Sequence, residues 1–343
     1  MKIAVDISPL KTGHQVRGIG SYTKSLINEF KEKNWGIDFE FFKSPNSPPP
    51  VDIIHYPYFD LFFHTLPINK KASRVVVTIH DIIPLIFPEH FPVGLKGNIN
   101  LRLQKLALKN VDAVICDSQT SKQDVINKLS LPEDKIHVVY LAPSEKFRPT
   151  TDKKVLSVVA KKYKLSGKFA LYVGDVNWNK NLQNLIESIK IAKVNLVMVG
   201  KALADKSLLQ TQVLNKLIKK LNLSEKIVKT GYVPDEDLVA IYNLADLTLL
   251  PSYYEGFGLP VLESMACGTS VVCSENSSLS EIAGPHAVFC NTDNPVDIAR
   301  KIKKVMEINP KQKQVLSQKL IEHASNFTWA KTTRETANIY KLL

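Results

Sequence analysis

Two glutamates with seven residues between them stand in the segment of the chain that is best equipped for chemistry. Glu255 opens a loop that contains Gly256 and Gly258, and Glu263 follows further on. Carboxylates accept hydrogen bonds from hydroxyl groups, and glycines let a ligand approach the backbone closely. At this spacing the two carboxylates do not form an acid–base pair on one helix face. They predict contacts to different ends of a long, hydroxyl-rich ligand; the alternative is a loop charge and a solvated helix residue.

The elements around these glutamates predict a phosphate site. The apolar run Asp246–Leu250 is typical of a buried strand, the glycine-bearing loop follows it, and a helix is expected over Val261–Ala266. Pro260 suits the first turn of that helix, where a backbone N–H has no intrahelical partner. A glycine loop at a helix N-terminus offers free N–H groups and the positive end of the helix dipole. We therefore expect an anionic group to bind there.

Glycines and polar side chains also follow predicted strands in the first half of the chain. Gly18 and Gly20, preceded by Arg17, stand at the start of a predicted helix and could hold a phosphate or a sugar. An ordinary helix-start turn is the alternative. His80 and Asp81 come directly after a predicted strand, and α/β proteins bind ligands at the carboxyl ends of such strands. A plain loop histidine is the alternative here; otherwise Asp81 is expected to orient the imidazole ring.

Charged residues begin two predicted helices in the second half. Lys180 precedes a helix that follows the predicted strand Phe169–Gly174. A lysine at a helix N-terminus opposes the helix dipole, so a bound anion would account for it. The acidic run Asp235–Asp237 formally matches a D-x-D metal-binding motif, but it opens a helix, where capping and the dipole explain acidic residues. No other cluster has metal-ligand spacing, so we expect no essential metal.

Apolar runs alternate with helical patterns from end to end, which predicts parallel sheets covered by helices on both faces. A break falls over residues 143–168, with about five strand–helix units on each side. Two Rossmann-like doubly wound sheets that face each other across a cleft are the simplest architecture. The expected strands are Lys2–Ile7, Asp52–His55, Arg74–Ile79, Asp112–Cys116, Ile136–Leu141, Phe169–Gly174, Asn195–Gly200, Lys226–Thr230, Asp246–Leu250 and Thr269–Cys273.

The composition excludes several classes of protein. The 343 residues, 44% of them hydrophobic, suffice for about two folded domains. The four cysteines lie in or beside apolar runs without a C-x-x-C pair, which predicts buried thiols in a reducing, cytoplasmic setting. The formal net charge is +12, yet residues 251–300 carry six acidic side chains and one basic one. A nucleic-acid-binding surface, with clustered cations and aromatic platforms, is therefore not expected. Residues 18–23, GIGSYT, lack the third glycine of a dinucleotide-binding fingerprint.

The segment EGFGLPVLE, with Glu255 and Glu263 at its ends, resembles the E-x7-E signature of the retaining glycosyltransferases of family 4. The resemblance extends over nearly the whole chain and implies the two-domain GT-B fold. It implies an acceptor-binding domain over residues 1–166, a donor-binding domain over 167–325, and a helix over 326–343 that crosses back to the first domain. The other segments that resemble the family are 18–26, 75–89, 111–125, 169–186, 229–252 and 327–340.

The resemblance also implies roles for individual residues. His80, Glu255 and Lys180 would act on the transferred sugar and the diphosphate, with Glu263 on the ribose, while Arg17 and Asp81 would lie on the acceptor side. The family usually places an arginine before the lysine, but this chain has Asn179, which puts a second cationic clamp in doubt. Val233 would border the nucleobase, unless its turn merely connects a strand to a helix. The donor-binding set is Gly18, Gly20, Lys180, Val233, Glu255, Gly256, Phe257, Gly258, Leu259 and Glu263.

The function implied by the resemblance is retaining transfer of a hexose from a nucleoside-diphosphate sugar to a hydroxyl of a glycan or lipid-linked acceptor. Similarity to mannosyltransferases favours GDP-mannose, and a UDP-sugar is the alternative. An epimerase or hydrolase of the same fold is a further alternative. No cofactor is implied besides the nucleotide sugar. We expect the enzyme in the cytoplasm, where the basic stretches Lys153–Lys168 and Lys301–Lys319 would suit the inner, anionic face of a membrane or serve as solvated helix faces.

Overall fold

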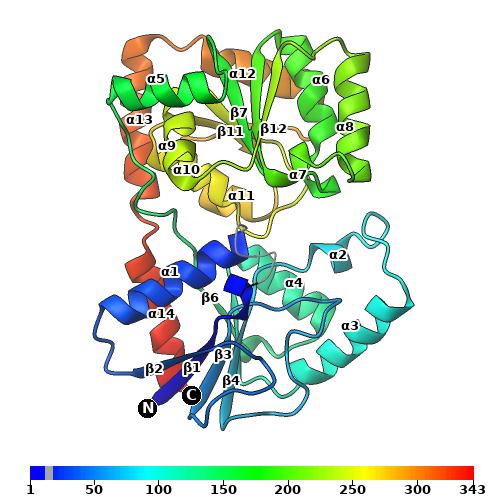
Figure 1. Cartoon of the computed structure of the whole chain (residues 1–343), viewed down its shortest axis with the longest axis vertical. Helices are drawn as coiled ribbons and strands as arrows, with labels where there is room; N and C mark the ends of the chain where they lie inside the picture. Colours follow the sequence, from blue (N-terminus) through cyan, green and yellow to red (C-terminus); the bar gives the residue numbers. More distant parts are fainter. Residues whose placement is uncertain (12–17) are drawn as a thin grey trace. The chain divides into compact units, whose positions relative to one another are not determined.

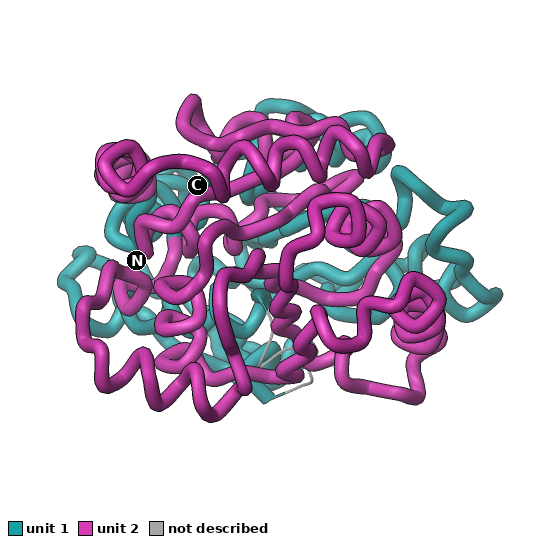
Figure 2. The backbone as a smooth tube through the Cα atoms, turned by 90° about the horizontal axis from the view of Figure 1, so that it is seen from above, with its two compact units in different colours: residues 1–142, 327–343 teal, residues 143–326 magenta. Residues whose placement is uncertain are grey.

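The computed structural model describes residues 1–11 and 18–343, which form two compact units. Unit 1 comprises residues 1–142 and 327–343, and unit 2 comprises residues 143–326 (Figure 2). Each unit contains a six-stranded sheet in which neighbouring strands run parallel, with helices on both sides (Figure 1). The predicted pair of Rossmann-like doubly wound sheets is confirmed.

The sheet of unit 1 has the strand order β2-β1-β3-β4-β5-β6. Helices α1 and α14 lie against one another on one side of the strands, and α3 and α4 lie on the other (Figure 1). The strands are β1 Lys2–Asp6, β2 Asp38–Phe42, β3 Ile53–Tyr56, β4 Arg74–Ile79, β5 Ala113–Cys116 and β6 Ile136–Val138. The helices are α1 Gly18–Glu32, α2 Ile83–Ile86, α3 Leu95–Leu108, α4 Gln119–Leu129 and α14 Trp329–Leu342, with 3-10 turns at Ser8–Lys11 and Glu133–Lys135.

The sheet of unit 2 has the order β12-β11-β10-β7-β8-β9. The first strand in sequence, β7, lies in the middle of the sheet. The chain then adds β8 and β9 on one side and β10, β11 and β12 on the other. Helices α5, α9, α10 and α13 lie on one side of its strands, and α6 and α8 on the other (Figure 1). The strands are β7 Phe169–Val173, β8 Asn195–Val199, β9 Ile227–Gly231, β10 Leu247–Leu250, β11 Ser270–Ser274 and β12 Val288–Cys290. The helices are α5 Lys153–Lys162, α6 Leu182–Ala192, α7 Lys201–Ala204, α8 Leu209–Lys220, α9 Asp235–Leu244, α10 Leu259–Ala266, α11 Ser277–Ile282, α12 Pro295–Met306 and α13 Pro310–Ala324, with a 3-10 turn, η3, at Trp178–Lys180.

All ten predicted strands are present, and the two that the sequence pattern did not reveal lie at sheet edges. β2 and β12 each pair with one neighbour only, β1 and β11 respectively, in the part of the chain that the structure describes. Their residues are mostly half-buried. A central parallel strand is covered on both faces and gives a continuous apolar run. In β2, Asp38 and Glu40 interrupt the run, and β12 has only three residues.

The division of the chain differs from the expected domain boundary at 166/167. Residues 143–166 belong to unit 2, because α5 packs against α9 and its Lys162 and Tyr163 both reach Asp237. The final helix, α14, belongs to unit 1 and packs against α1.

The four cysteines are buried and unbridged. Among the described residues no helix is long and apolar enough to cross a bilayer.

A buried polar chain ties α14 to the sheet of unit 1. His55 Nδ1 lies 2.6 Å from the hydroxyl of Tyr340, and His55 Nε2 lies 2.8 Å from Thr78 Oγ1. Thr78 Oγ1 in turn lies 3.1 Å from the hydroxyl of Tyr22 on α1. Burial, together with the charge of nearby His80, lowers the pKa of His55 to about 3, so its imidazole is neutral. These bonds satisfy polar groups that would otherwise be costly to bury.

We expect the Tyr340→Phe substitution to lower the free energy of unfolding by about 1–3 kcal/mol, because it leaves a buried nitrogen of His55 without its partner. Denaturant unfolding measures the change. Tyr232→Phe, which alters an exposed tyrosine, is the matched control and should change stability by less than about 0.5 kcal/mol. Equal stability of the two variants would contradict this account of the α14 attachment.

Candidate functional site

The strand order of unit 2 reverses between β7 and β10, and in doubly wound sheets such a switch point forms a crevice at the strand ends. These strands are neighbours, but the chain leaves β7 toward β8 and leaves β10 toward β11, on opposite sides. Loops that follow the two strands therefore diverge, and this is where doubly wound sheets bind ligands. The loop after β7 carries Lys180, and the loop after β10 carries Glu255. Two residues that lie 75 positions apart in sequence meet at this point.

Lys180 and Glu255 form an ion pair at the crevice. Lys180 Nζ donates to Glu255 Oε1 and Oε2, each at 2.8 Å, and Ser252 Oγ donates to Oε1 at 2.6 Å. The glutamate is buried and the lysine is mostly buried. Removing both charges from water is unfavourable unless each is well paired, and here the carboxylate holds three hydrogen bonds. The crevice thus contains one cation and one carboxylate held in defined positions.

The amides on either side of Lys180 fasten the two loops to one another. Asn179 Nδ2 donates to the carbonyl of Tyr254 at 2.9 Å, and the N–H of Tyr253 donates to the carbonyl of Asn179 at 2.8 Å. Asn181 Nδ2 donates to the carbonyl of Pro251 at 2.9 Å. Asn179 stands where the resembled family usually has an arginine. Here it is buried, and its hydrogen bonds hold the two loops together. A second cation is not supplied at this position.

Serine hydroxyls from the start of α11 hold the loop that carries Glu255. Ser277 Oγ accepts from the N–H of Glu255 at 3.0 Å, and Ser278 Oγ donates to the carbonyls of Glu255 and Phe257 at 3.0 and 2.8 Å. Ser277 adopts a positive φ of 51°, a conformation that non-glycine residues adopt at a cost. Sequence reasoning missed these serines; their place directly after β11, the neighbour of β10, was the available signal.

The glycine loop reaches the N-terminus of α10 through Gly258. This residue has φ of 101°, and a Cβ there would lie 2.4 Å from Leu279 Cδ2 on α11. Packing against α11 therefore requires glycine at this position in addition to any need for ligand access. Gly256 and Phe257 are buried, and Leu259 begins the helix. The N–H groups of the first turn of α10 remain the predicted contacts for an anion.

Glu263 lies one turn into α10 and has surroundings of its own. The hydroxyl of Tyr242, on α9, donates to Glu263 Oε2 at 2.8 Å. Burial raises the pKa of Glu263 to about 7, although the bond from Tyr242 acts in the opposite direction. The carboxyl therefore changes charge near neutral pH. The two glutamates of the motif do not form a pair with each other, as their spacing predicts.

Two expectations for α9 and the turn before it need correction. The side chain of Val233 is buried in the core of unit 2, so it is not presented to a ligand; the neighbouring Tyr232 is the exposed side chain of this turn.

Asp235–Asp237 lie in the first turn of α9 but do not cap it. Asp237 accepts from Lys162 and Tyr163, a structural tie to α5. Among the described residues no group of His, Cys, Asp and Glu is arranged to hold a metal ion.

In unit 1, His80 follows β4 and pairs with Asp117, which follows the neighbouring strand β5. His80 Nδ1 lies 2.6 Å from Asp117 Oδ2, and Nε2 lies 3.1 Å from the carbonyl of Pro57. Burial by itself lowers the pKa of His80, but the carboxylate of Asp117 more than offsets this and raises it. Asp117 Oδ1 is buried without a partner among the described residues.

The prediction that Asp81 orients the ring of His80 is wrong, because Asp117 occupies that position. Asp81 Oδ1 instead accepts from the N–H of Ile83 at the start of α2. The sequence carried a signal for Asp117, which is the first polar residue after the run Ala113–Cys116. The sequence does not show which strand lies beside β4, and the sequence alone therefore favours the nearer aspartate, Asp81.

The predicted contacts at the start of α1 are only partly described. The helix begins at Gly18, which is exposed with no atom near the position of a Cβ, and Gly20 is buried. Nothing in the packing of the described residues requires glycine at position 18, so the option of close approach by a ligand stays open. Arg17 lies outside the described residues.

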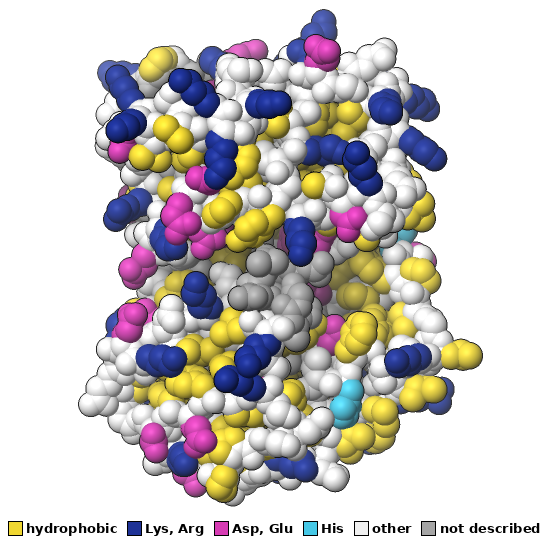
Figure 3. All heavy atoms as spheres, in the orientation of Figure 1, with side chains coloured by type: hydrophobic (Ala, Val, Ile, Leu, Met, Phe, Trp, Pro, Cys, Tyr) yellow, Lys and Arg dark blue, Asp and Glu magenta, His cyan; other side chains and the backbone are white. Residues whose placement is uncertain are grey.

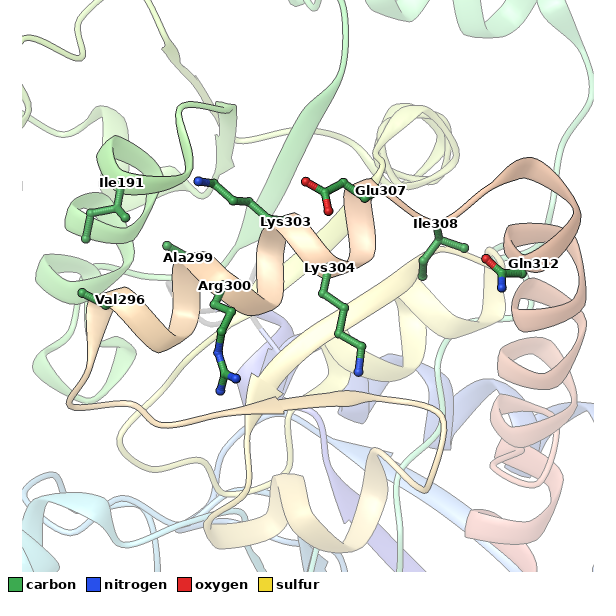
Figure 4. A pocket seen from close by; sticks show the side chains of 9 residues that line it. All are labelled: Ile191, Val296, Ala299, Arg300, Lys303, Lys304, Glu307, Ile308 and Gln312. Atoms are coloured by element: carbon green, nitrogen blue, oxygen red, sulfur yellow. The ribbon is translucent and has the colours of Figure 1, made fainter.

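A hollow of about 580 Å³ lies elsewhere on unit 2, along α12 (Figure 4). Arg300, Lys303 and Lys304 project from that helix, and Ile191 of α6 lies at one end. None of the predicted site residues lines this hollow. The ion pair at the crevice, and not this hollow, marks the place where the sequence motifs and the geometry of unit 2 agree.

Known proteins with similar sequences are sugar transferases. Residues 159–323 match the model of the group 1 glycosyl transferases, and residues 45–142 match that of glycosyltransferase family 4. O-antigen chain mannosyltransferase B of Escherichia coli is 30% identical over 290 residues, covering 83% of this chain and 75% of that protein. The serotype-specific mannosyltransferase WbdA of Escherichia coli is 28% identical over 285 residues, 80% of this chain and about a third of that protein.

Solved structures of similar fold support the fold assignment. The sucrose-phosphate synthase of Thermosynechococcus elongatus has a TM-score of 0.76 at 17% identity, covering 100% of this chain and 98% of that one. Anabaena HepE in complex with UDP and glucose has a TM-score of 0.77 at 18% identity, with both chains covered completely. The fold is GT-B, and the chain belongs to glycosyltransferase family 4, the group 1 glycosyl transferases.

Proposed function

We propose that this glycosyltransferase moves a mannosyl residue from GDP-mannose to a hydroxyl of a glycan or lipid-linked acceptor in the synthesis of a cell-surface polysaccharide. The observation that carries the proposal is the ion pair of Lys180 and Glu255 at the crevice of unit 2. The choice of mannose is supported by relatives named O-antigen chain mannosyltransferases, from Escherichia coli and Salmonella typhimurium. The reaction is proposed to occur in the cytoplasm.

The two members of the ion pair are suited to different parts of the donor. Lys180 would meet the diphosphate together with the N–H groups at the start of α10, and Glu255 would accept from hydroxyls of the sugar. Glu263 would accept from the ribose hydroxyls. In the free protein Lys180 and Glu255 satisfy each other, so the arriving donor replaces one set of charged hydrogen bonds with another. Each of the two buried charges is therefore paired both before and after the donor binds.

The chemical step that we propose retains the configuration of the anomeric carbon. The acceptor oxygen bonds to that carbon on the face from which the diphosphate departs, and the bond from the carbon to the phosphate oxygen breaks. The acceptor proton passes to the departing phosphate oxygen, so no carboxylate pair of the glycosidase type is needed. Negative charge grows on the diphosphate, and Lys180 and the α10 N–H groups stabilise it. His80 of unit 1 is proposed to contact the transferred sugar, and unit 1 is proposed to supply the acceptor site.

A panel of nucleotide sugars tests the proposed donor. We expect GDP-mannose to raise the thermal unfolding temperature more than UDP-glucose or UDP-galactose, since a bound ligand stabilises the folded state by mass action. Product analysis with and without an acceptor alcohol then separates transfer from hydrolysis or epimerisation. Free mannose, or an epimerised sugar, as the main product in the presence of acceptor would overturn the assignment. A stronger shift with a UDP-sugar would reassign the donor and leave the site in place.

Replacing Lys180 by alanine should reduce kcat/KM by roughly 10²–10³-fold, because the leaving diphosphate loses its charged donor. Asp237→Ala is the matched control, since that carboxylate bonds to α5 and lies in the acidic run that formally matches a metal motif. It should change kcat/KM by less than about threefold while lowering stability modestly. Comparable kinetic losses in the two variants would revive the metal-site interpretation of Asp235–Asp237.

Binding of the nucleotide sugar should weaken as the pH falls below 7, because protonated Glu263 no longer accepts two ribose hydrogen bonds as a carboxylate. With the pKa of Glu263 at about 7, the carboxylate form predominates above that pH. Below it, the fraction of Glu263 in the carboxylate form falls by up to about tenfold for each pH unit. Calorimetric titration with GDP-mannose between pH 5.5 and about 8 measures the dependence. Glu263→Gln should bind more weakly and with a flatter profile; a profile as steep as that of the wild type would refute the role.

Asp117→Asn should move the His80 limb of the kcat/KM pH profile to lower pH. The carboxylate of Asp117 raises the pKa of His80, whereas an amide keeps the position of the ring without the charge. Asp81→Asn serves as the comparison, since the charge of Asp81 also raises the pKa of His80 but less than that of Asp117, and its carboxylate accepts from the N–H of Ile83. A larger displacement of the limb by Asp81→Asn than by Asp117→Asn would show that the pairing seen in the structure does not control His80.

A further inference from the structure

Helix α3 carries a second row of large apolar side chains that points into solvent. Leu95, Ile99 and Leu106 are 86%, 58% and 48% exposed. Their spacing of four and seven residues places them on one side of the helix. The opposite side is buried, through residues such as Ala107 and Leu108. One face of α3 therefore serves the core of unit 1, and the other presents aliphatic side chains to the outside.

The charges on this helix all have the same sign. Residues 93–110 contain four basic side chains and no acidic one. Arg102 lies within the outward apolar row, and Lys96 and Lys105 lie on its two flanks. None of the three forms an ion pair with a carboxylate of the described residues, and each is exposed. A solvated helix of a soluble domain usually mixes both signs of charge.

A neighbouring loop extends the apolar row. Phe63 is 70% exposed, and its loop is fastened to α3 because Asn100 Nδ2 donates to the carbonyl of Phe62 at 2.7 Å and Gln104 Nε2 donates to that of Asp60 at 3.1 Å. Hydrophobic and basic side chains appear together over α3 in Figure 3. We call this area the α3 surface, and it consists of Phe63, Leu95, Lys96, Ile99, Arg102, Lys105 and Leu106.

We propose that the α3 surface docks on an anionic lipid bilayer, with α3 lying in the interfacial plane. Leucine and isoleucine side chains would enter the boundary of the acyl chains, and lysine and arginine would reach the lipid phosphates around them. Charge complementarity selects this occupant, because an all-basic rim around aliphatic side chains matches anionic headgroups above an apolar layer. The proposal goes beyond the proposed function and does not depend on which sugar is transferred.

The two basic stretches expected from the sequence fit a bilayer less well. In α5, within Lys153–Lys168, the outward apolar side chains are the two smaller valines Val155 and Val158, and Lys162 is already paired with Asp237. The stretch Lys301–Lys319 includes Glu307 and spans the break between α12 and α13. Large aliphatic side chains surrounded only by basic charge distinguish α3 from both.

Vesicle flotation at about 0.1 M salt tests the proposal with the whole chain. We expect the protein to float with vesicles of equal parts phosphatidylglycerol and phosphatidylcholine and not with pure phosphatidylcholine. The triple variant Leu95→Asn, Ile99→Asn, Leu106→Asn should bind at least about tenfold more weakly, since three apolar contacts are lost. All three positions are exposed, so folding and the thermal shift with the nucleotide sugar should be retained.

The matched control is the double variant Leu209→Asn, Val213→Asn on α8, which also carries exposed aliphatic side chains beside lysines without an acidic residue. It should float like the wild type. Equal loss of binding in the two variants, or no binding of the wild type to the anionic vesicles, would overturn the proposal. A concentration-dependent dimer in sedimentation that only the α3 variant abolishes would also overturn it and assign the surface to a second copy of the chain. Loss of flotation with an intact thermal shift separates this result from failure of the donor assignment.

Discussion

The buried ion pair of Lys180 and Glu255 is the constraint around which unit 2 is arranged. Two opposite charges can stay in a mostly buried crevice only if hydrogen bonds surround them and hold their geometry. The Rossmann-type strand order brings their loops together, because β7 and β10 are neighbours from which the chain departs in opposite directions. Asn179, Asn181 and the serines at the start of α11 then fix both loops. The catalytic proposal rests on this rigidity, since charge stabilisation depends on donors already in place.

Unit 1 uses the same physical device with different residues. His80 and Asp117 follow the neighbouring strands β4 and β5. Their pairing stabilises a mostly buried imidazole and a buried carboxylate at the carboxyl ends of these strands. Parallel strands gather polar side chains at their carboxyl ends, where the backbone of the sheet stops and loops begin. Each unit therefore holds one partnered pair of ionisable groups at the same end of its sheet. The pair in unit 2 is the one on which the proposed binding of the nucleotide-sugar donor rests.

The α3 surface differs from the two site regions in the exposure and pairing of its side chains. In the crevice, Lys180 and Glu255 are mostly buried and paired with each other. The basic side chains of α3, in contrast, have no carboxylate partner among the described residues, and its apolar row faces outward. Burial of one face supplies the stability of the helix, so the opposite face is free to serve another surface. Residues 93–110, which include α3, contribute four basic side chains and no acidic one. Of the six acidic side chains in residues 251–300, Glu255 and Glu263 belong to the predicted site and Asp297 lies in the first turn of α12.

The sequence by itself determined the central strands, the loop–helix motif from Glu255 to Glu263, and Lys180 as the cation before α6. These features depend on local patterns: continuous apolar runs, glycine and proline at a helix start, and a charge at a helix N-terminus. Tertiary structure decided what depends on which strands are neighbours. Asp117 rather than Asp81 faces His80, Val233 is directed into the core, and Ser277 and Ser278 support the glutamate loop. The edge strands β2 and β12 were found only in the fold, because two acidic residues interrupt β2 and β12 has only three residues.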